Sequence, residues 1–252
     1  MSDSFSTSRF VQLTRNELER NYRAVLIVSA VLALLTVLGP AGLAYARYTT
    51  VGFYRFFFIG ALFVWGTFAA SLAFRDMHGR LTNAPFLLLP ATALEKTLAR
   101  LVIGTVFLIV YLLLLTSALS LLGETFELVG RGSNEWFSPL DGMAWTVIPH
   151  FVIVQSVFFL GAAWFRKMHY VKTLLAVALI ATGLSVVSAT LGWLGWATWN
   201  GGGVNFDGSD SFFVPMRWLG ELLKVAYFVG LPLFCWYVAW LRVKETQVSH
   251  GV

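Results

Sequence analysis

Long apolar stretches alternate with short polar connections along the whole chain of 252 residues. The apolar stretches cover residues 24–46, 53–74, 98–122, 144–165, 173–199 and 217–241. Each one reaches the length of about 20 residues that an α-helix needs to cross the hydrocarbon core of a bilayer. The connections between them leave no room for a sizeable soluble domain. The pattern therefore predicts an all-α membrane protein with six transmembrane helices.

The same pattern predicts one transmembrane domain over residues 1–252. It is expected to comprise a cytoplasmic amphipathic segment (1–23), a six-helix membrane part (24–241) and a cytoplasmic tail (242–252). The first span contains Gly39-Pro40 late in its length. A proline removes a backbone donor, so we expect the helix to end or kink there.

Composition agrees with a membrane protein. Hydrophobic residues make up 58% of the chain and charged residues only 12%, whereas about 25% is usual in soluble domains. The single cysteine, Cys235, cannot form an internal disulfide. The net charge of +5 is compatible with a nucleic-acid partner, but the way the charge is distributed favours a membrane, and we expect no nucleic-acid partner.

Lysine and arginine are concentrated on one side of the predicted membrane domain. Thirteen of them fall in residues 1–23, 75–100, 166–172 and 242–252, and four lie on the other side, namely Arg47, Arg55, Arg131 and Arg217. Cytoplasmic connections carry the excess of positive charge. Both termini and the connection 75–100 are therefore predicted to be cytoplasmic.

No pattern of catalytic residues is present in the sequence. The histidines His78, His150, His169 and His250 do not share a helix at metal-ligand spacing, and there is no nucleotide-binding P-loop. We therefore expect no catalytic residue, no metal site and no cofactor bound by this chain. If the protein uses ATP, another chain must hydrolyse it.

Two charged residues, Glu221 and Lys224, lie inside the sixth predicted span, and Arg217 just precedes them on the same helical face. Each charge would cost about 2.5–3.5 kcal/mol at the bilayer centre. Because they lie in the first two turns, the favoured interpretation is an interfacial ladder of ion pairs. The alternative is that Glu221 and Lys224 face a substrate path that opens outward.

The N-terminal segment has an apolar side formed by Phe10, Leu13, Leu18 and Tyr22. This predicts an amphipathic helix on the inner leaflet that turns into the first span. Thr14-x-x-Glu17 matches a capping box, which allows a helix to restart there. The alternative is a simple charged flank.

The connection after the second span also contains residues that define the start of a helix. Pro90 keeps the residue before it out of the helical region, and Thr92-x-x-Glu95 is a second capping box. Glu95 then lies in the first turn, where the helix dipole favours a carboxylate, and Lys96 and Arg100 hold the inner edge of the third span. The apolar run 86–89 must be covered by lipid, by the protein itself or by a partner.

Three stretches resemble one protein family. LLLPATALEK (87–96), FLGAAWFRKMHYVKTLLA (159–176) and WYVAWLRVKETQV (236–248) are similar to the permease subunits of bacterial ABC-2-type transporters, in the group with six short-looped spans. The resemblance implies a dimer of permeases, as a homodimer or a related heterodimer, in the bacterial cytoplasmic (inner) membrane. It also implies two separate ATPase subunits, which bind ATP and Mg, and outward transport of the substrate.

In that family an N-terminal helix and a short coupling helix between the second and third spans rest on the ATPase. Carried over to this sequence, the coupling interface comprises Arg75, Asp76, His78, Arg80, Phe86, Leu88, Pro90, Thr92, Glu95 and Lys96. Membrane lipids are the remaining partners that we expect. Two other readings stay open: a membrane scaffold or assembly protein without a nucleotide partner, and an ion-coupled carrier that uses Glu221 and Lys224.

Overall fold

The computed structural model describes residues 5–45, 50–78, 91–131, 142–201 and 213–249, and all regular secondary structure in these ranges is helical. The helices are α1 (Thr7–Tyr45), α2 (Thr50–Leu72), α3 (Arg75–His78), α5 (Ala93–Val102), α6 (Leu108–Arg131), α7 (Gly142–Trp164), α8 (His169–Gly201), α9 (Phe213–Val225) and α10 (Leu231–Ser249). Two π-helical segments, η1 (Ile103–Phe107) and η2 (Ala226–Gly230), join α5 to α6 and α9 to α10.

Within these ranges, five helices are long and apolar enough to cross a membrane. They cover Gly52–His78, Ala93–Leu122, Gly142–Trp164, His169–Trp193 and Trp218–Thr246. They coincide with the second to sixth predicted spans, which confirms the all-α, multi-pass character of the chain. The first predicted span, 24–46, lies in the later part of α1.

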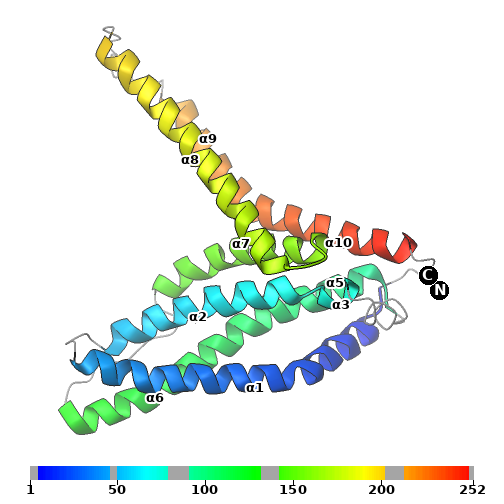
Figure 1. Cartoon of the computed structure of the whole chain (residues 1–252), viewed down its shortest axis with the longest axis vertical. Helices are drawn as coiled ribbons and strands as arrows, with labels where there is room; N and C mark the ends of the chain where they lie inside the picture. The colour runs from blue at the N-terminus through cyan, green and yellow to red at the C-terminus, as the bar shows by residue number, and fades with distance from the viewer. Residues whose placement is uncertain (1–4, 46–49, 79–90, 132–141, 202–212, 250–252) are drawn as a thin grey trace.

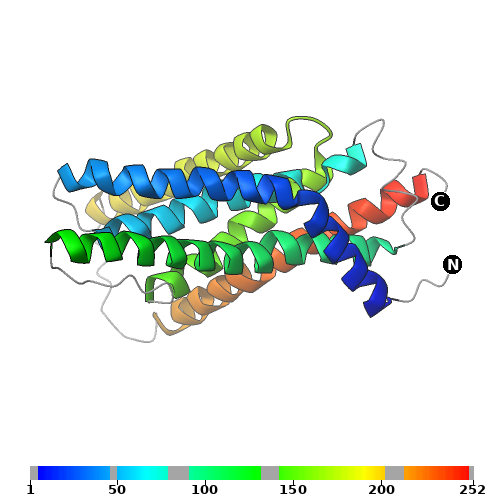
Figure 2. The same ribbon diagram turned by 90° about the horizontal axis from the view of Figure 1, so that it is seen from below.

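Helix α1 is continuous from Thr7 to Tyr45, and this corrects the expected helix restart at Thr14 and excludes one of the two alternatives, an end at Gly39-Pro40. No helix restarts at Thr14: its hydroxyl donates a hydrogen bond to the carbonyl of Phe10, at 2.9 Å, as a threonine inside a helix does. The helix also does not end at Gly39-Pro40. Figure 2 shows that the first turns of α1 are bent away from the rest of the helix.

Helices α1, α2 and α6 run alongside one another, and α7 packs against both α2 and α10 (Figure 1). One apolar core lies among α1, α2, α6 and α7 and contains Leu32, Phe58, Leu62, Leu112 and Phe151. A second core, centred on Phe74 and Phe159, is formed by α2, α3, α5, α7 and α10. The start of α1 and the end of α10 lie at the same end of the bundle, which we call the terminal end (Figure 1).

The start of α8 packs against α7 and α2, whereas the rest of α8 and α9 lie apart from the other helices. In Figure 1 both project away from the bundle, and no side chain is buried in the most apolar stretch of α8. Leu179, Leu184 and Leu191 are each more than 60% exposed. A helix that is apolar on all sides is stable only with apolar surroundings, so this surface belongs in lipid or against another membrane helix.

Candidate functional site: a polar clasp at the terminal end

Helix α5 begins with the capping box that the sequence predicts. Thr92 has an extended backbone and its hydroxyl accepts a hydrogen bond from the N–H of Glu95, at 3.2 Å. The N–H of Thr92 donates to Oε2 of Glu95 at 2.8 Å. Both groups of the motif are therefore satisfied, as this local spacing dictates, and the carboxylate of Glu95 is held in one orientation.

The other carboxylate oxygen of Glu95 reaches the beginning of α1. Oε1 accepts hydrogen bonds from the backbone N–H of Ser6, at 2.7 Å, and from Nη2 of Arg9, at 3.2 Å. The Glu95 side chain is fully buried. Hydrogen bonds to a charged acceptor are about twice as strong as neutral ones. One buried carboxylate thus ties the first turn of α1 to the first turn of α5.

A second set of ion pairs lies further along both helices. Arg100 of α5 donates to Oε1 of Glu17, at 3.1 Å, and to Oδ2 of Asp76, at 3.3 Å. It also donates to the carbonyl of Ala73, at the end of α2, and lies over the ring of Phe74. Only 7% of its side chain is exposed, so this guanidinium joins α1, α2, α3 and α5.

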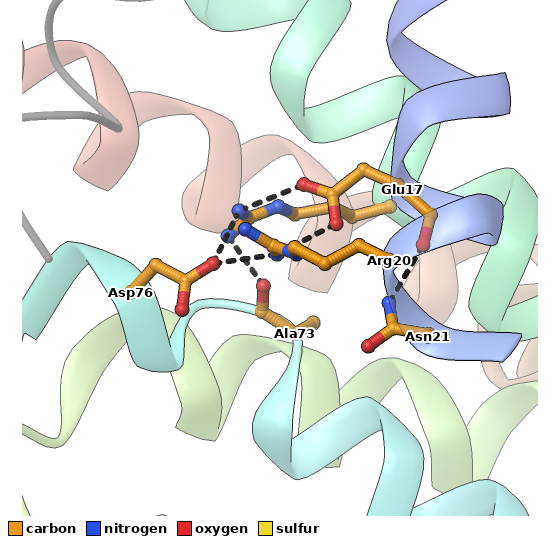
Figure 3. A network of polar contacts seen from close by, with 6 residues as sticks. Glu17, Arg20, Asn21, Ala73 and Asp76 are labelled. Carbon is orange, nitrogen blue, oxygen red and sulfur yellow. Dashed lines mark hydrogen bonds and ion pairs between the residues drawn. The ribbon is translucent and has the colours of Figure 1, made fainter. Parts of the chain in front are cut away.

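Arg20 completes the arrangement from the α1 side. Its Nη2 lies 2.7 Å from both Oε2 of Glu17 and Oδ2 of Asp76 (Figure 3). Partial burial opposes its charge, but the two carboxylates outweigh that effect and raise the pKa of Arg20 above its usual value. Two acids and two arginines therefore neutralise one another. We call Ser6, Arg9, Glu17, Arg20, Asp76, Thr92, Glu95 and Arg100 the clasp.

The structure places the predicted coupling residues in three groups. Asp76, Thr92 and Glu95 belong to the clasp, and Lys96 beside them is 2% exposed. These side chains contact their own chain instead of presenting themselves at the surface. Arg75 is exposed and His78 is half-buried. Arg80, Phe86, Leu88 and Pro90 lie outside the described residues.

The predicted apolar side of the N-terminal helix is divided between two environments. Leu13 is buried, Phe10 and Leu18 are half-buried, and Tyr22 is exposed, with the guanidinium of Arg23 over its ring. Leu13 thus faces the protein, whereas Tyr22 faces outward. The helix packs on α5 as well as presenting an apolar surface for a membrane.

Glu221 and Lys224, the predicted charges of the sixth span, form an ion pair of 2.7 Å on the surface of α9. Their side chains are 70% and 66% exposed, so neither lies in the interior of the described bundle. The side chain of Arg217, the third member of the expected ladder, is outside the described part. Exposed pairs of this kind contribute about 0–1 kcal/mol.

Sequence analysis missed the partners within the clasp. It assigned Glu17 to a capping box and placed Arg100 at the membrane edge, but it did not bring them together. The available signal was the presence of opposite charges flanking the first, second and third spans, since buried charges need partners. It also missed the contact between His78 and His169, whose rings stack 5.2 Å apart.

The clasp contains no nucleophile paired with a general base. Among the residues that the structure describes, no group of three or more histidine, cysteine or acidic side chains could hold a metal ion. Comparison of the chain with protein-family models, curated proteins and solved structures finds no match. The clasp is a set of ion pairs and hydrogen bonds that connects α1, α2, α3 and α5 at the terminal end of the bundle.

Proposed function

We propose that this chain is the membrane-spanning permease subunit of an ATP-driven transporter of the ABC-2 type. It works as a dimer in the bacterial cytoplasmic membrane, with both termini and the terminal end of the bundle on the cytoplasmic side. Two separate ATPase subunits bind ATP and Mg, and the transporter exports its substrate. The resemblance of residues 87–96, 159–176 and 236–248 to such permeases, together with five described spans, supports this proposal.

The observation that carries the proposal is the clasp. The resemblance places two elements on the ATPase, the N-terminal helix and the connection before α5. In the structure the first turn of α5, which follows that connection, is joined to the start of α1 by Glu95, which binds Ser6 and Arg9. In this proposal a displacement of the N-terminal helix is passed to α5 through these contacts.

The clasp also leads directly into the membrane helices. Helix α5 continues through η1 into α6, so movement of its first turn moves the third span. Arg100 holds the last turn of α2 through Ala73, and α1 continues from the N-terminal helix into the first predicted span. In this proposal Glu95 and Arg100 transmit the ATP-driven movement inside the permease. The surface that contacts the ATPase lies outside the clasp in this proposal.

A pull-down of the tagged chain in mild detergent, followed by mass spectrometry, tests the class of protein. The expected result is an ATPase chain with a nucleotide-binding P-loop at equal stoichiometry. A complex with a different partner and no dependence on nucleotide would contradict the proposal and support the scaffold reading. Transport in liposomes by this chain alone, abolished by Glu221→Gln, would support the carrier.

The role of the clasp is tested in the same complex. We expect Glu95→Gln and Arg100→Gln to assemble with the ATPase but to weaken the influence of the permease on ATP hydrolysis by fivefold or more. Glu19→Gln is the matched control, because Glu19 forms an exposed pair with Arg15 on the same helix. Equal coupling in all three variants would remove the clasp from the mechanism.

A further inference from the structure

A pair of histidines joins two spans at the terminal end, outside the clasp. The rings of His78, the last residue of α3, and His169, the first residue of α8, stack 5.2 Å apart with an angle of 25° between their planes. Nε2 of His78 lies 3.0 Å from the carbonyl oxygen of Ala162 in α7. The pair therefore fixes the end of the second span against the turn between α7 and α8.

Cationic side chains from four segments lie near this pair. Arg75 precedes His78 by three residues in α3, Lys172 follows His169 by three residues in α8, and Arg166 lies in the turn just before His169. Arg242 lies over the ring of Trp164, next to that turn. They come from α3, from the turn 165–168, from α8 and from α10. We call Arg75, Arg166, Lys172 and Arg242 the basic edge.

The basic edge is not neutralised by the protein. Arg242 is paired with Glu245 at 2.8 Å, but no ion pair within the described ranges joins Arg75, Arg166 or Lys172 to a carboxylate. All three are exposed. In the clasp, by contrast, each arginine forms an ion pair with an acidic side chain. Three exposed cations without such a partner give the basic edge a net positive charge, so an anion at this position would be bound favourably.

The surroundings of the basic edge favour a lipid anion. The four segments are the ends of candidate spans, which places them at the level of the headgroups. Trp164 and Met168 beside them are 56% and 68% exposed, and the guanidinium of Arg242 lies 5.2 Å from the ring centre of Trp164. Tryptophan is enriched at the membrane interface, and basic pockets between spans bind the headgroups of anionic lipids.

The backbone adds to the positive potential. Helix α8 starts at His169, directly after Met168, whose φ of 54° turns the chain sharply. The first turn of α8 contains no acidic residue, so the positive end of its dipole is uncompensated there. This contribution has the same sign as the charge of the four cations.

We infer that the basic edge binds the phosphate headgroup of an anionic glycerophospholipid, with Arg75, Arg166 and Lys172 as its ligands. The lipid would bridge α3, the α7–α8 turn and α8, and so add to the contacts that hold the start of α8 to the bundle. This inference rests on the multi-pass membrane character of the chain and does not depend on the permease proposal.

The test measures lipid retained by the purified chain. Native mass spectrometry of protein extracted from nanodiscs of phosphatidylcholine and phosphatidylglycerol counts the bound phosphatidylglycerol. We expect Arg75→Gln/Arg166→Gln/Lys172→Gln to retain at least tenfold less of it than the unmodified chain. The matched control, Arg15→Gln/Arg23→Gln/Lys224→Gln, removes three exposed cations elsewhere and is expected to retain it within twofold.

Three further outcomes decide the inference. Equal losses in both triple variants would show a general effect of charge and overturn the site, as would full retention in the first variant. Arg75→Lys/Arg166→Lys keeps the charge and is expected to keep the lipid, which separates lost binding from lost folding. If inorganic phosphate at millimolar concentration displaces the lipid, or stabilises the chain equally well without it, the site is one for free phosphate and the lipid assignment is wrong.

Discussion

Glu95 shows how one buried charge can be satisfied. Its carboxylate accepts from Ser6, Arg9 and Thr92 within 3.2 Å, which offsets the cost of removing it from water. An amide in its place cannot accept all three bonds, because only one of its two terminal atoms is an acceptor. Removing one partner of such a network leaves the others buried without a hydrogen bond. The cost of these unsatisfied groups determines how much the protein is destabilised.

We therefore expect Glu95→Gln to lower the free energy of unfolding by about 1–3 kcal/mol. Thermal unfolding in detergent, followed by tryptophan fluorescence, measures the change. Glu19→Gln serves again as the control, since its exposed pair with Arg15 contributes about 0.3–0.5 kcal/mol. Equal melting temperatures for the two variants would show that the buried carboxylate is not a structural contact.

Gly161 permits the close approach of α8 to α7. A Cβ atom at this position would lie 1.9 Å from Oγ1 of Thr173, and that hydroxyl is fixed by its hydrogen bond to the carbonyl of His169. Gly161→Ala is expected to destabilise the chain by about 1–3 kcal/mol. Gly183→Ala in the open part of α8 is the matched control and should be neutral or slightly stabilising. If Gly161→Ala leaves the stability unchanged, α8 does not pack against α7 at this position.

Gln155 is a buried amide in α7 whose Oε1 and Nε2 have no hydrogen-bond partner among the described residues. Its Nε2 lies beside Gly104 of η1. Burying an unpaired amide costs about 1–3 kcal/mol, so Gln155→Leu should raise the melting temperature, while Gln155→Ala should lower it by leaving a cavity. A lower melting temperature for the leucine variant would show that the amide is engaged in a stabilising contact.

At the scale of elements, the clasp joins α1 to α5. A double-mutant cycle of Glu17→Gln and Arg100→Gln measures this link, because it isolates the pairwise energy. We expect a coupling of about 1–3 kcal/mol in thermal stability, since both side chains are mostly buried. The cycle of Arg15→Gln and Glu19→Gln should give about 0.5 kcal/mol or less. If the stability changes of Glu17→Gln and Arg100→Gln simply add, the two side chains are not coupled and the proposed link between α1 and α5 is wrong.

Local sequence rules predicted the parts of the site that are local. The capping box at Thr92 and Glu95 and the apolar spans follow from residues within one or two turns. The structure confirms the capping box and five of the six predicted spans. The contacts between Ser6 and Glu95 or between Arg20 and Asp76 join residues 89 and 56 positions apart. No spacing rule connects such positions. The continuous α1 was missed because Thr14 can cap a helix or bond within one, and packing of Leu13 against the protein favours the second.

At the scale of the whole molecule, the charge distribution predicts a definite topology. Alkaline phosphatase, which is active outside the cytoplasm, should be inactive when fused after residue 249 and active when inserted in the connections 132–141 or 202–212. A fluorescent protein should give the reverse pattern. Activity of the phosphatase at the tail would place both termini outside and would contradict a cytoplasmic terminal end.

The separation of Ser6 and Glu95 along the chain also determines when the clasp can form during synthesis. Ser6 precedes Glu95 by 89 residues, and at about 5–20 residues per second the ribosome needs roughly 4–18 s to synthesise that interval. During it, the second span must emerge and enter the membrane while the beginning of α1 has no partner in α5. The clasp therefore cannot close before Glu95 has been synthesised, and a chain that stalls earlier keeps the start of α1 without this partner.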